Sequence, residues 1–153
     1  MKKSRLIISI LIAIFGIISA FVLMAEAFGE GGLGSGFLVI FGEDNWNYNV
    51  VVPLIIAFVV EIICVLLPFL SLIFDKKIAK IIFGTGAVLD IACGVMMLLA
   101  LQLFVAANTE KLPAFDTESY LGGLGPAFIS NAVMVFIAAA IGLVGVLLVN
   151  RED

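Results

Sequence analysis

Charged residues separate four long apolar runs along the chain. The runs cover residues 6–28, 50–74, 78–107 and 126–149, and each is longer than the roughly 20 residues that a helix needs to cross about 30 Å of hydrocarbon. The sequence does not alternate apolar and polar positions over segments of about 10 residues, as the strands of a transmembrane barrel do. The pattern therefore predicts an all-α membrane protein, with a single four-helix transmembrane domain that forms a bundle in the lipid bilayer.

Composition narrows the possible functions. The chain is 63% hydrophobic and only 13% charged, whereas a soluble domain is about 25% charged, so a soluble enzyme is excluded. Eight Lys and Arg residues are too few for the clustered basic surface that nucleic acid requires. Without histidine, neither a transition-metal site nor a nucleophile–base pair is expected, and Gly84-Thr85-Gly86 lacks the third glycine of a dinucleotide fingerprint. We therefore expect no enzymatic activity, no metal and no cofactor.

The basic residues predict the orientation of the chain. Seven of the eight lie before the first run, around the turn between the second and third runs, or after the fourth: Lys2, Lys3, Arg5, Lys76, Lys77, Lys80 and Arg151. By the positive-inside rule, this distribution predicts a multi-pass protein of the cell membrane with cytoplasmic N- and C-termini. Residues 25–27 fit a signal-peptide cleavage site, but the apolar stretch before them is longer than a signal sequence needs, so we expect an uncleaved anchor.

Both outer loops contain a similar glycine-rich string. Residues 31–37 read GGLGSGF and residues 122–128 read GGLGPAF, which reflects either a duplicated helix pair or a chance similarity between two loops. Residues 38–41 are apolar, are bounded by glycines and predict a short β-strand in the first outer loop, with a segment that dips into the membrane surface as the alternative. Trp46 and Tyr48 precede the second run, where aromatic side chains anchor helices at the membrane interface. A carbohydrate- or partner-binding patch is the alternative for these two residues.

One segment of the first outer loop resembles a known group of proteins. Residues 36–42 read GFLVIFG and are followed by a span, a lysine-containing turn and two more spans. This arrangement resembles small tetraspan membrane proteins of low-GC Gram-positive bacteria, and the resemblance implies a bacterial tetraspan without naming an activity. The chain is also similar to claudin-like tetraspans in topological outline, but it lacks their paired loop cysteines and W-x-x-W-type pattern. Cys64 and Cys93 lie inside apolar runs instead, and we expect no disulfide between them.

Two acidic residues lie within apolar runs, Glu61 in the second and Asp90 in the third. Both are 14 residues from the charged turn between these runs, so an antiparallel hairpin places them at one depth, about 21 Å from the turn. No basic residue lies at that depth, and two carboxylates in a low dielectric cannot both stay ionised, so at least one should hold a proton near neutral pH. They form either a proton- or cation-binding site or a structural pair, bonded to each other or to Asn131 or Ser71.

Small residues form a stripe on the first run and another on the fourth: Ser9, Ala13, Gly16 and Ala20, and Ala138, Gly142 and Gly145. Such stripes permit close helix packing, either within the chain or between chains. The leading hypothesis from the sequence is therefore a non-enzymatic tetraspan that acts through lateral helix contacts, as a homo-oligomer or with a partner membrane protein. The alternative is a small proton- or cation-coupled transporter or channel subunit that uses Glu61 and Asp90.

Overall fold

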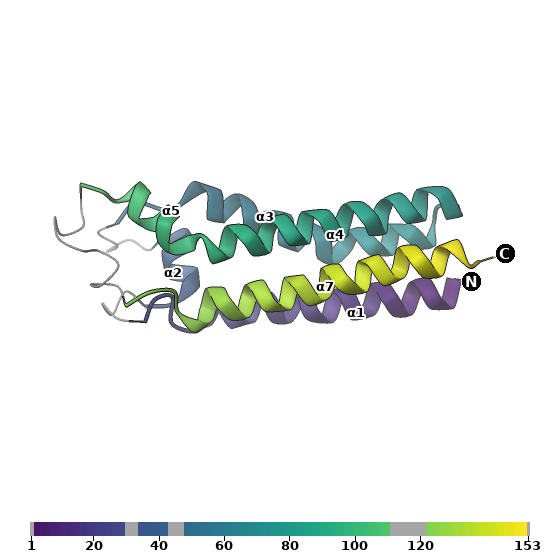
Figure 1. Cartoon of the computed structure of the whole chain (residues 1–153), viewed down its shortest axis with the longest axis horizontal. Helices are drawn as coiled ribbons and strands as arrows, with labels where there is room; N and C mark the ends of the chain where they lie inside the picture. Colours follow the sequence, from purple (N-terminus) through teal and green to yellow (C-terminus); the bar gives the residue numbers. More distant parts are fainter. Residues whose placement is uncertain (1, 30–33, 43–47, 111–121, 153) are drawn as a thin grey trace.

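The computed structural model of the chain describes residues 2–29, 34–42, 48–110 and 122–152. Four long helices lie side by side along the molecule (Figure 1): α1 (Lys2–Phe21), α3 (Val52–Leu66), α4 (Lys76–Leu98) and α7 (Pro126–Asn150). With short 3-10 extensions of α1 and α3, each is long and apolar enough to cross a membrane. Large hydrophobic side chains are exposed along all four helices, as lipid contact requires. The predicted set of four apolar helices is confirmed, and the chain has the helical architecture of a multi-pass membrane protein.

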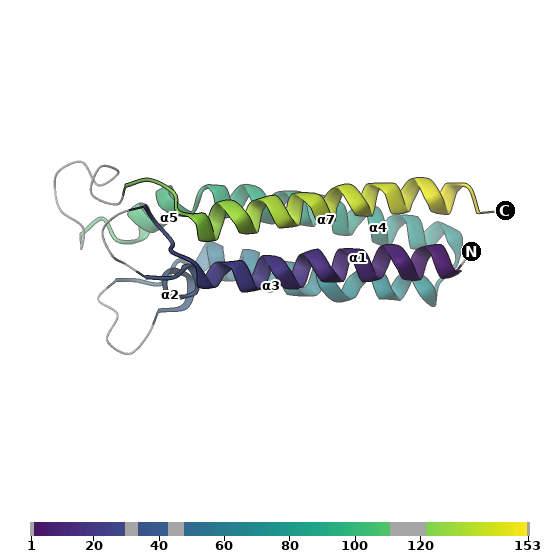
Figure 2. The same cartoon turned by 90° about the horizontal axis from the view of Figure 1, so that it is seen from below.

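The four long helices form a closed ring of contacts. α1 packs against α3 and α7, and α4 packs against the same two helices, most extensively against α7. Both chain termini lie at one end of this bundle, together with the turn at Asp75, and we term it the terminal end (Figure 1). The opposite end, termed the loop end, holds the short helices α2 (Gly36–Phe41) and α5 (Ala100–Ala107) (Figure 2).

Two of the predicted spans are interrupted. α3 changes into a 3-10 helix, η2 (Leu67–Leu72), whose second residue is Pro68. Because proline has no N–H group, it cannot continue the hydrogen-bond ladder of the α-helix. In the third run, α4 ends at Leu98, and the chain continues as α5 beyond Leu99, which has φ −89° and ψ 6°. The run 78–107 is therefore two helices rather than one long one, and the second belongs to the loop end.

The two glycine-rich strings meet at the loop end. The segment 25–29, which follows α1, lies between them and makes one antiparallel bridge to each, Glu26–Ser35 and Phe28–Leu124. The Ala27 N–H donates to Gly34 O (2.9 Å), and the Gly125 N–H donates to Ala27 O (2.8 Å). A Cβ at Gly125 would lie only 2.6 Å from a backbone oxygen of this segment, so the close approach requires glycine. The similar strings thus hold the same segment from both sides.

The segment predicted to be a β-strand is helical, so that prediction was wrong. Residues 38–41 belong to α2, whose first turn donates a backbone hydrogen bond to the Ser35 hydroxyl (3.3 Å), and the helix ends at Gly42 with φ of 70°. Phe37 and Phe41, four residues apart, stack with ring centroids 6.3 Å apart, while two residues between them are fully buried. A short apolar run bounded by glycines suits either structure, and here packing at a helical spacing decides between them.

Candidate functional site

Glu61 and Asp90 face the interior of the bundle and line one gap. Glu61 projects from α3 and Asp90 from α4, and the two residues are 2% and 4% exposed. Gly16 of α1 and Val135 of α7 line the same gap, so all four long helices surround it. The gap is too small to admit a water molecule. The structure therefore brings together the two acids at the centre of the bundle, enclosed by protein.

Asn131 connects Glu61 to the backbone of α1. Its side-chain Nδ2 group donates to Glu61 Oε2 (3.0 Å) and to Ser19 O (2.8 Å). Glu61 Oε1 and Asn131 Oδ1 are buried and have no hydrogen-bond partner among the described residues. A buried acceptor oxygen without a donor is unusual in a folded protein. A proton on Glu61 would turn the unpartnered carboxyl oxygen into a donor.

Asp90 also lines a second small gap, which lies on the terminal side of the first. Pro68 and Gly86 contribute to the wall of this second gap, and Cys64 lines both gaps. The Cys64 thiol approaches Gly86 O at 3.9 Å, and Cys64 and Cys93 are buried free thiols. No group of three His, Cys, Asp or Glu side chains within the described ranges is placed to hold a metal ion.

The charges around the two acids are unbalanced. Glu61 and Asp90 line the same gap, so their charges repel each other when both are ionised. Around the gap, α1 and α7 contribute apolar side chains. The Asn131 amide also comes from α7, and the Cys64 thiol comes from α3. None of these residues is basic, so neither carboxylate gains a neutralising cation in this low-dielectric interior. The arrangement is chemically suited to hold at least one proton.

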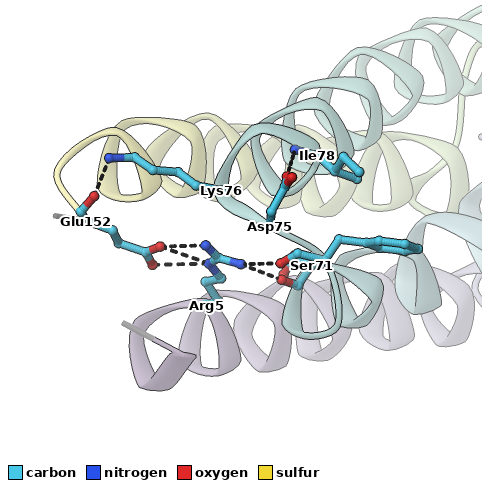
Figure 3. Close-up of polar contacts among 7 residues, drawn as sticks. Arg5, Ser71, Asp75, Lys76, Ile78 and Glu152 are labelled. Atoms are coloured by element: carbon cyan, nitrogen blue, oxygen red, sulfur yellow. Dashed lines mark hydrogen bonds and ion pairs between the residues drawn. The ribbon is translucent and has the colours of Figure 1, made fainter.

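At the terminal end, Arg5 forms a clamp that joins three parts of the chain (Figure 3). Its guanidinium group pairs with the carboxylate of Glu152, with Nη2–Oε2 at 2.7 Å and Nε–Oε2 at 3.0 Å. Its Nη1 group donates to Ser71 O (2.7 Å) and Phe74 O (3.0 Å) at the end of the second span. Lys76 Nζ donates to the backbone oxygen of Glu152. Since the Arg5 and Glu152 side chains are only 8% and 7% exposed, this is a buried ion pair.

The sequence predicts a role for Arg5 only in the orientation of the chain, and the clamp was not predicted. One sequence signal was present: Arg5 lies four residues before Ser9 and eleven before Gly16, on the same face of α1. Ser9 is fully buried and donates from Oγ to Pro68 O (3.0 Å). A basic residue in register with a buried stripe points toward the interior, so periodicity alone could have predicted its burial. Its partner Glu152 lies 147 residues away and could not be predicted.

Both stripes of small residues pack within the chain. On α1, Ser9 and Gly16 are buried, whereas Ala13 and Ala20 are half-buried. A Cβ at Gly16 would lie 2.4 Å from the side chain of Val65 in α3. The α7 stripe is fully buried and faces α4 and α1: Ala138, Gly142 and Gly145. These surfaces are therefore not available for contacts between chains in this structure.

The two aromatic residues predicted as interface anchors have different outcomes. Trp46 lies outside the described residues. Tyr48 is half-buried and packs on Phe104 with ring centroids 5.4 Å apart, at the margin of the loop-end core. Its ring thus contacts the protein interior at the start of the second span.

No family model, no curated protein and no solved structure matches this chain. Its function has to be inferred from the chemistry of its buried polar groups. Among the described residues, the buried polar and charged side chains are Arg5, Ser9, Ser19, Glu61, Ser71, Asp90, Asn108 and Asn131. All except Asn108 lie at the acid pair or between it and the terminal end. The bundle is therefore chemically different on the two sides of the pair.

Proposed function

We propose that this chain is a non-enzymatic membrane protein that takes up and releases a proton at Glu61 and Asp90, as the central site of a small proton-coupled transporter. The observation that supports the proposal is their convergence on one closed gap. Each acid in the middle of a membrane costs about 2.5–3.5 kcal/mol on insertion scales, and such residues mark functional sites by default. Two in one gap, without a cation beside them, double that cost.

Hydrogen bonding supports a functional pair over a structural one. A pair retained only to fix helix packing would be expected to satisfy all its buried polar atoms. Here one oxygen of Glu61 and one of Asn131 have no partner among the described residues. These unpaired oxygens are costly in a static arrangement, but they are useful to a site that changes its protonation state.

The size of the gap favours a proton over a metal cation. A divalent cation such as Ca²⁺ takes six to eight oxygen ligands, whereas this gap offers two carboxyl groups and does not admit water. A proton needs neither space nor a ligand shell. We therefore propose the proton as the ion that binds at Glu61 and Asp90.

We further propose that the terminal end faces the cytoplasm and that the protein resides in the cell membrane. The basic residues Lys2, Lys3, Lys76, Lys77 and Arg151 all belong to segments at this end. The positive-inside rule favours such an end on the cytoplasmic side. Under this orientation the glycine-rich strings and α2 lie outside the cell.

Proton flux into reconstituted vesicles tests the proposed function. Purified protein is placed in vesicles that contain a pH-sensitive dye, and a pH gradient with a membrane potential is applied. We expect flux above that of empty vesicles, and at least a tenfold loss in Glu61→Gln and in Asp90→Asn, because an amide cannot exchange a proton in this way. The matched control is Glu26→Gln, which removes an exposed acid at the loop end and should leave the flux unchanged.

Flux equal to that of empty vesicles in the wild type would contradict the proposal. So would an unchanged flux in both core variants. Circular dichroism and size-exclusion profiles should show that the variants retain the fold, so that a loss of flux reports chemistry.

A second candidate function, lateral contact with another membrane protein or with a second copy, is favoured by a different surface. A groove of about 260 Å³ lies between α3 and α4, toward their loop-end halves, and its lining is apolar: Pro53, Ile56, Ala57, Val60, Leu89, Ala92, Cys93 and Met96. Crosslinking in native membranes from a residue in this groove tests the idea. A crosslink from Ile56 that is absent from Leu147, an exposed residue of α7, would support it. No crosslink from either position would count against it.

A further inference from the structure

Asn131 and Ser19 lie beside Glu61, and from the acid pair a longer series of polar groups extends toward the terminal end. In α4, Asp90 is 14 residues from the first residue, Lys76, and 8 from the last, Leu98, or about 21 Å and 12 Å at 1.5 Å per residue. The loop end is thus the nearer end of the helix. The buried polar side chains nevertheless continue toward the farther, terminal end.

The interface of α1, α3–η2 and α4 contains a series of polar groups on the terminal side of Asp90. The second gap joins Asp90 to Pro68, whose backbone oxygen accepts the hydrogen bond from Ser9. One turn further lies Ser71, whose hydroxyl oxygen is buried and has no partner among the described residues. Ser71 O in turn accepts a hydrogen bond from Arg5. The series therefore runs from the acid pair to the clamp with a small gap and an unpaired hydroxyl along it.

Irregular backbone accompanies this series. The second span is a 3-10 helix over Leu67–Leu72, and such a stretch within a span is tolerated where it is enclosed by protein or lines a cavity. The segment η2 forms the end of the second span, and the hydrogen-bond geometry of a 3-10 helix is poorer than that of an α-helix. The segment η2 packs against both α1 and α4, so its movement would widen the interface that contains the polar groups.

The loop side of the acid pair has the opposite character. Its core is made of tightly packed apolar side chains that are at most 4% exposed: Leu23, Phe28, Ile40, Leu54, Met97, Phe104 and Phe128. Phe28 contacts Phe104 and Phe128 with ring centroids 5.2 and 6.0 Å apart. We term this cluster the aromatic plug. The side chains of this plug offer no polar group to a proton or to water.

We infer that protons reach Asp90 and Glu61 from the terminal end, along the interface of α1, η2 and α4, and that the Arg5–Glu152 pair is the gate of this entrance. The inference rests on the proposed function and adds its sidedness and its gate. Glu152 follows the last residue of α7 by two positions, so it can leave Arg5 without unpacking any long helix. Once released, both charged side chains gain hydration, which offsets part of the lost ion pair.

Cys64 is a natural reporter for this entrance because it lines both gaps beside Asp90. The other thiol is removed by Cys93→Ala. Ag⁺, a small thiol-reactive cation, is then added to either face of oriented membrane vesicles. Protection of Cys64 from later alkylation in denaturant is measured by mass spectrometry. In the Cys93→Ala background, Glu152→Gln should speed the reaction from the terminal side about tenfold, as expected for loss of one charge-assisted hydrogen bond.

Three controls keep this test decisive. Glu26→Gln at the loop end should change the reaction from neither side. Lys76→Met, which removes the hydrogen bond from Lys76 Nζ to the Glu152 backbone, should speed the terminal-side reaction by a smaller factor, and it serves if Glu152→Gln does not fold. Reaction from the loop side should stay slow in every variant.

The possible outcomes distinguish a failure of the proposed gate from a failure of the proposed function. Faster reaction from the loop side, or no change from the terminal side in either gate variant, would overturn the entrance and its gate. If flux depends on Glu61 and Asp90 while Ag⁺ enters from the loop side, the proposed function stands and this inference fails. If Ag⁺ enters from the terminal side while Glu61→Gln and Asp90→Asn leave proton flux intact, the entrance exists but the proton function fails, and with it the inference that protons use this route.

Discussion

The two halves of the bundle are held together in different ways. On the loop side of Glu61 and Asp90, aromatic and aliphatic side chains of α2, α3, α4, α5 and α7, and of the segment that follows α1, fill the interior. On the terminal side, fewer large side chains meet, and a buried ion pair, the hydrogen bond from Ser9 and close glycine contacts join the helices. When apolar side chains separate, water does not replace the contacts that they lose. The members of an ion pair, or a hydroxyl group, can instead form hydrogen bonds to water. The comparison indicates one half whose core is sealed by apolar packing, with an apolar groove between α3 and α4 at its side, and one half that can open.

The sealed half should be the more sensitive to lost volume. Phe104 is fully buried in the aromatic plug, so Phe104→Ala should lower the free energy of unfolding by about 3–5 kcal/mol. Unfolding in mixed detergent, followed by circular dichroism, measures this change. Phe21→Ala, at a position that is 63% exposed, is the control and should cost much less. Equal losses at the two positions would mean that the plug is not a packed core.

The terminal half should depend on the geometry of its charges. Arg5→Lys keeps the positive charge but loses the planar fork that bonds Glu152 and two backbone oxygens at once. We expect a loss of about 1.5–3 kcal/mol, the value of a hydrogen bond to a charged group. Lys3→Arg, on an exposed position of the same helix, should change stability by less than about 0.5 kcal/mol. If Arg5→Lys leaves the free energy of unfolding unchanged, the clamp contributes only through its positive charge.

Close packing of α1 on α3 can be tested with one methyl group. Gly16→Ala places a Cβ 2.4 Å from Val65 Cγ2, and such overpacking costs about 1–3 kcal/mol. Gly84→Ala on α4 places a Cβ 3.9 Å from Val146 Cγ2, so it should be tolerated and should gain helix propensity. Thermal unfolding of the two variants in the same detergent compares them. Destabilisation by Gly84→Ala, with Gly16→Ala neutral, would contradict the observed helix packing.

The smallest effect is expected at the acid pair itself. Glu61→Gln retains an oxygen that accepts from Asn131 Nδ2, so stability should change by less than about 1 kcal/mol. Glu61→Leu removes that acceptor and should cost about 1–3 kcal/mol. Denaturation curves of both variants separate the contribution of the Glu61 hydrogen bond to stability from the contribution of its charge. A large loss in Glu61→Gln would mean that the carboxylate is ionised and needed for the fold.

Those features that depend on position along the chain could be predicted from the sequence. The four apolar runs predict four spans because the length of a span can be counted directly along the sequence. The common depth of Glu61 and Asp90 follows from equal distances to one turn. Whether their side chains share a gap depends on how the helices rotate about their axes, and only the structure shows it.

Features that depend on distant partners or on several weak local preferences could not be predicted. The ion pair of Arg5 and Glu152 joins the two ends of the chain. The helix at residues 38–41 was mistaken for a strand because a six-residue apolar stretch has no decisive period. The sequence predicts the stripes of small residues, but only the structure shows that Gly16, Gly142 and Gly145 pack inside the bundle rather than against another chain.

The central claim is that Glu61 and Asp90 share an exchangeable proton, and infrared difference spectroscopy tests it most directly. The carboxylic C=O stretch of the protein in lipid nanodiscs is recorded over a pH titration. We predict a protonated carboxyl band at neutral pH that shifts on H/D exchange, disappears in the Glu61→Gln, Asp90→Asn double variant and persists in Glu26→Gln. A wild-type spectrum without such a band at neutral pH, or a band unchanged in the double variant, would contradict the claim.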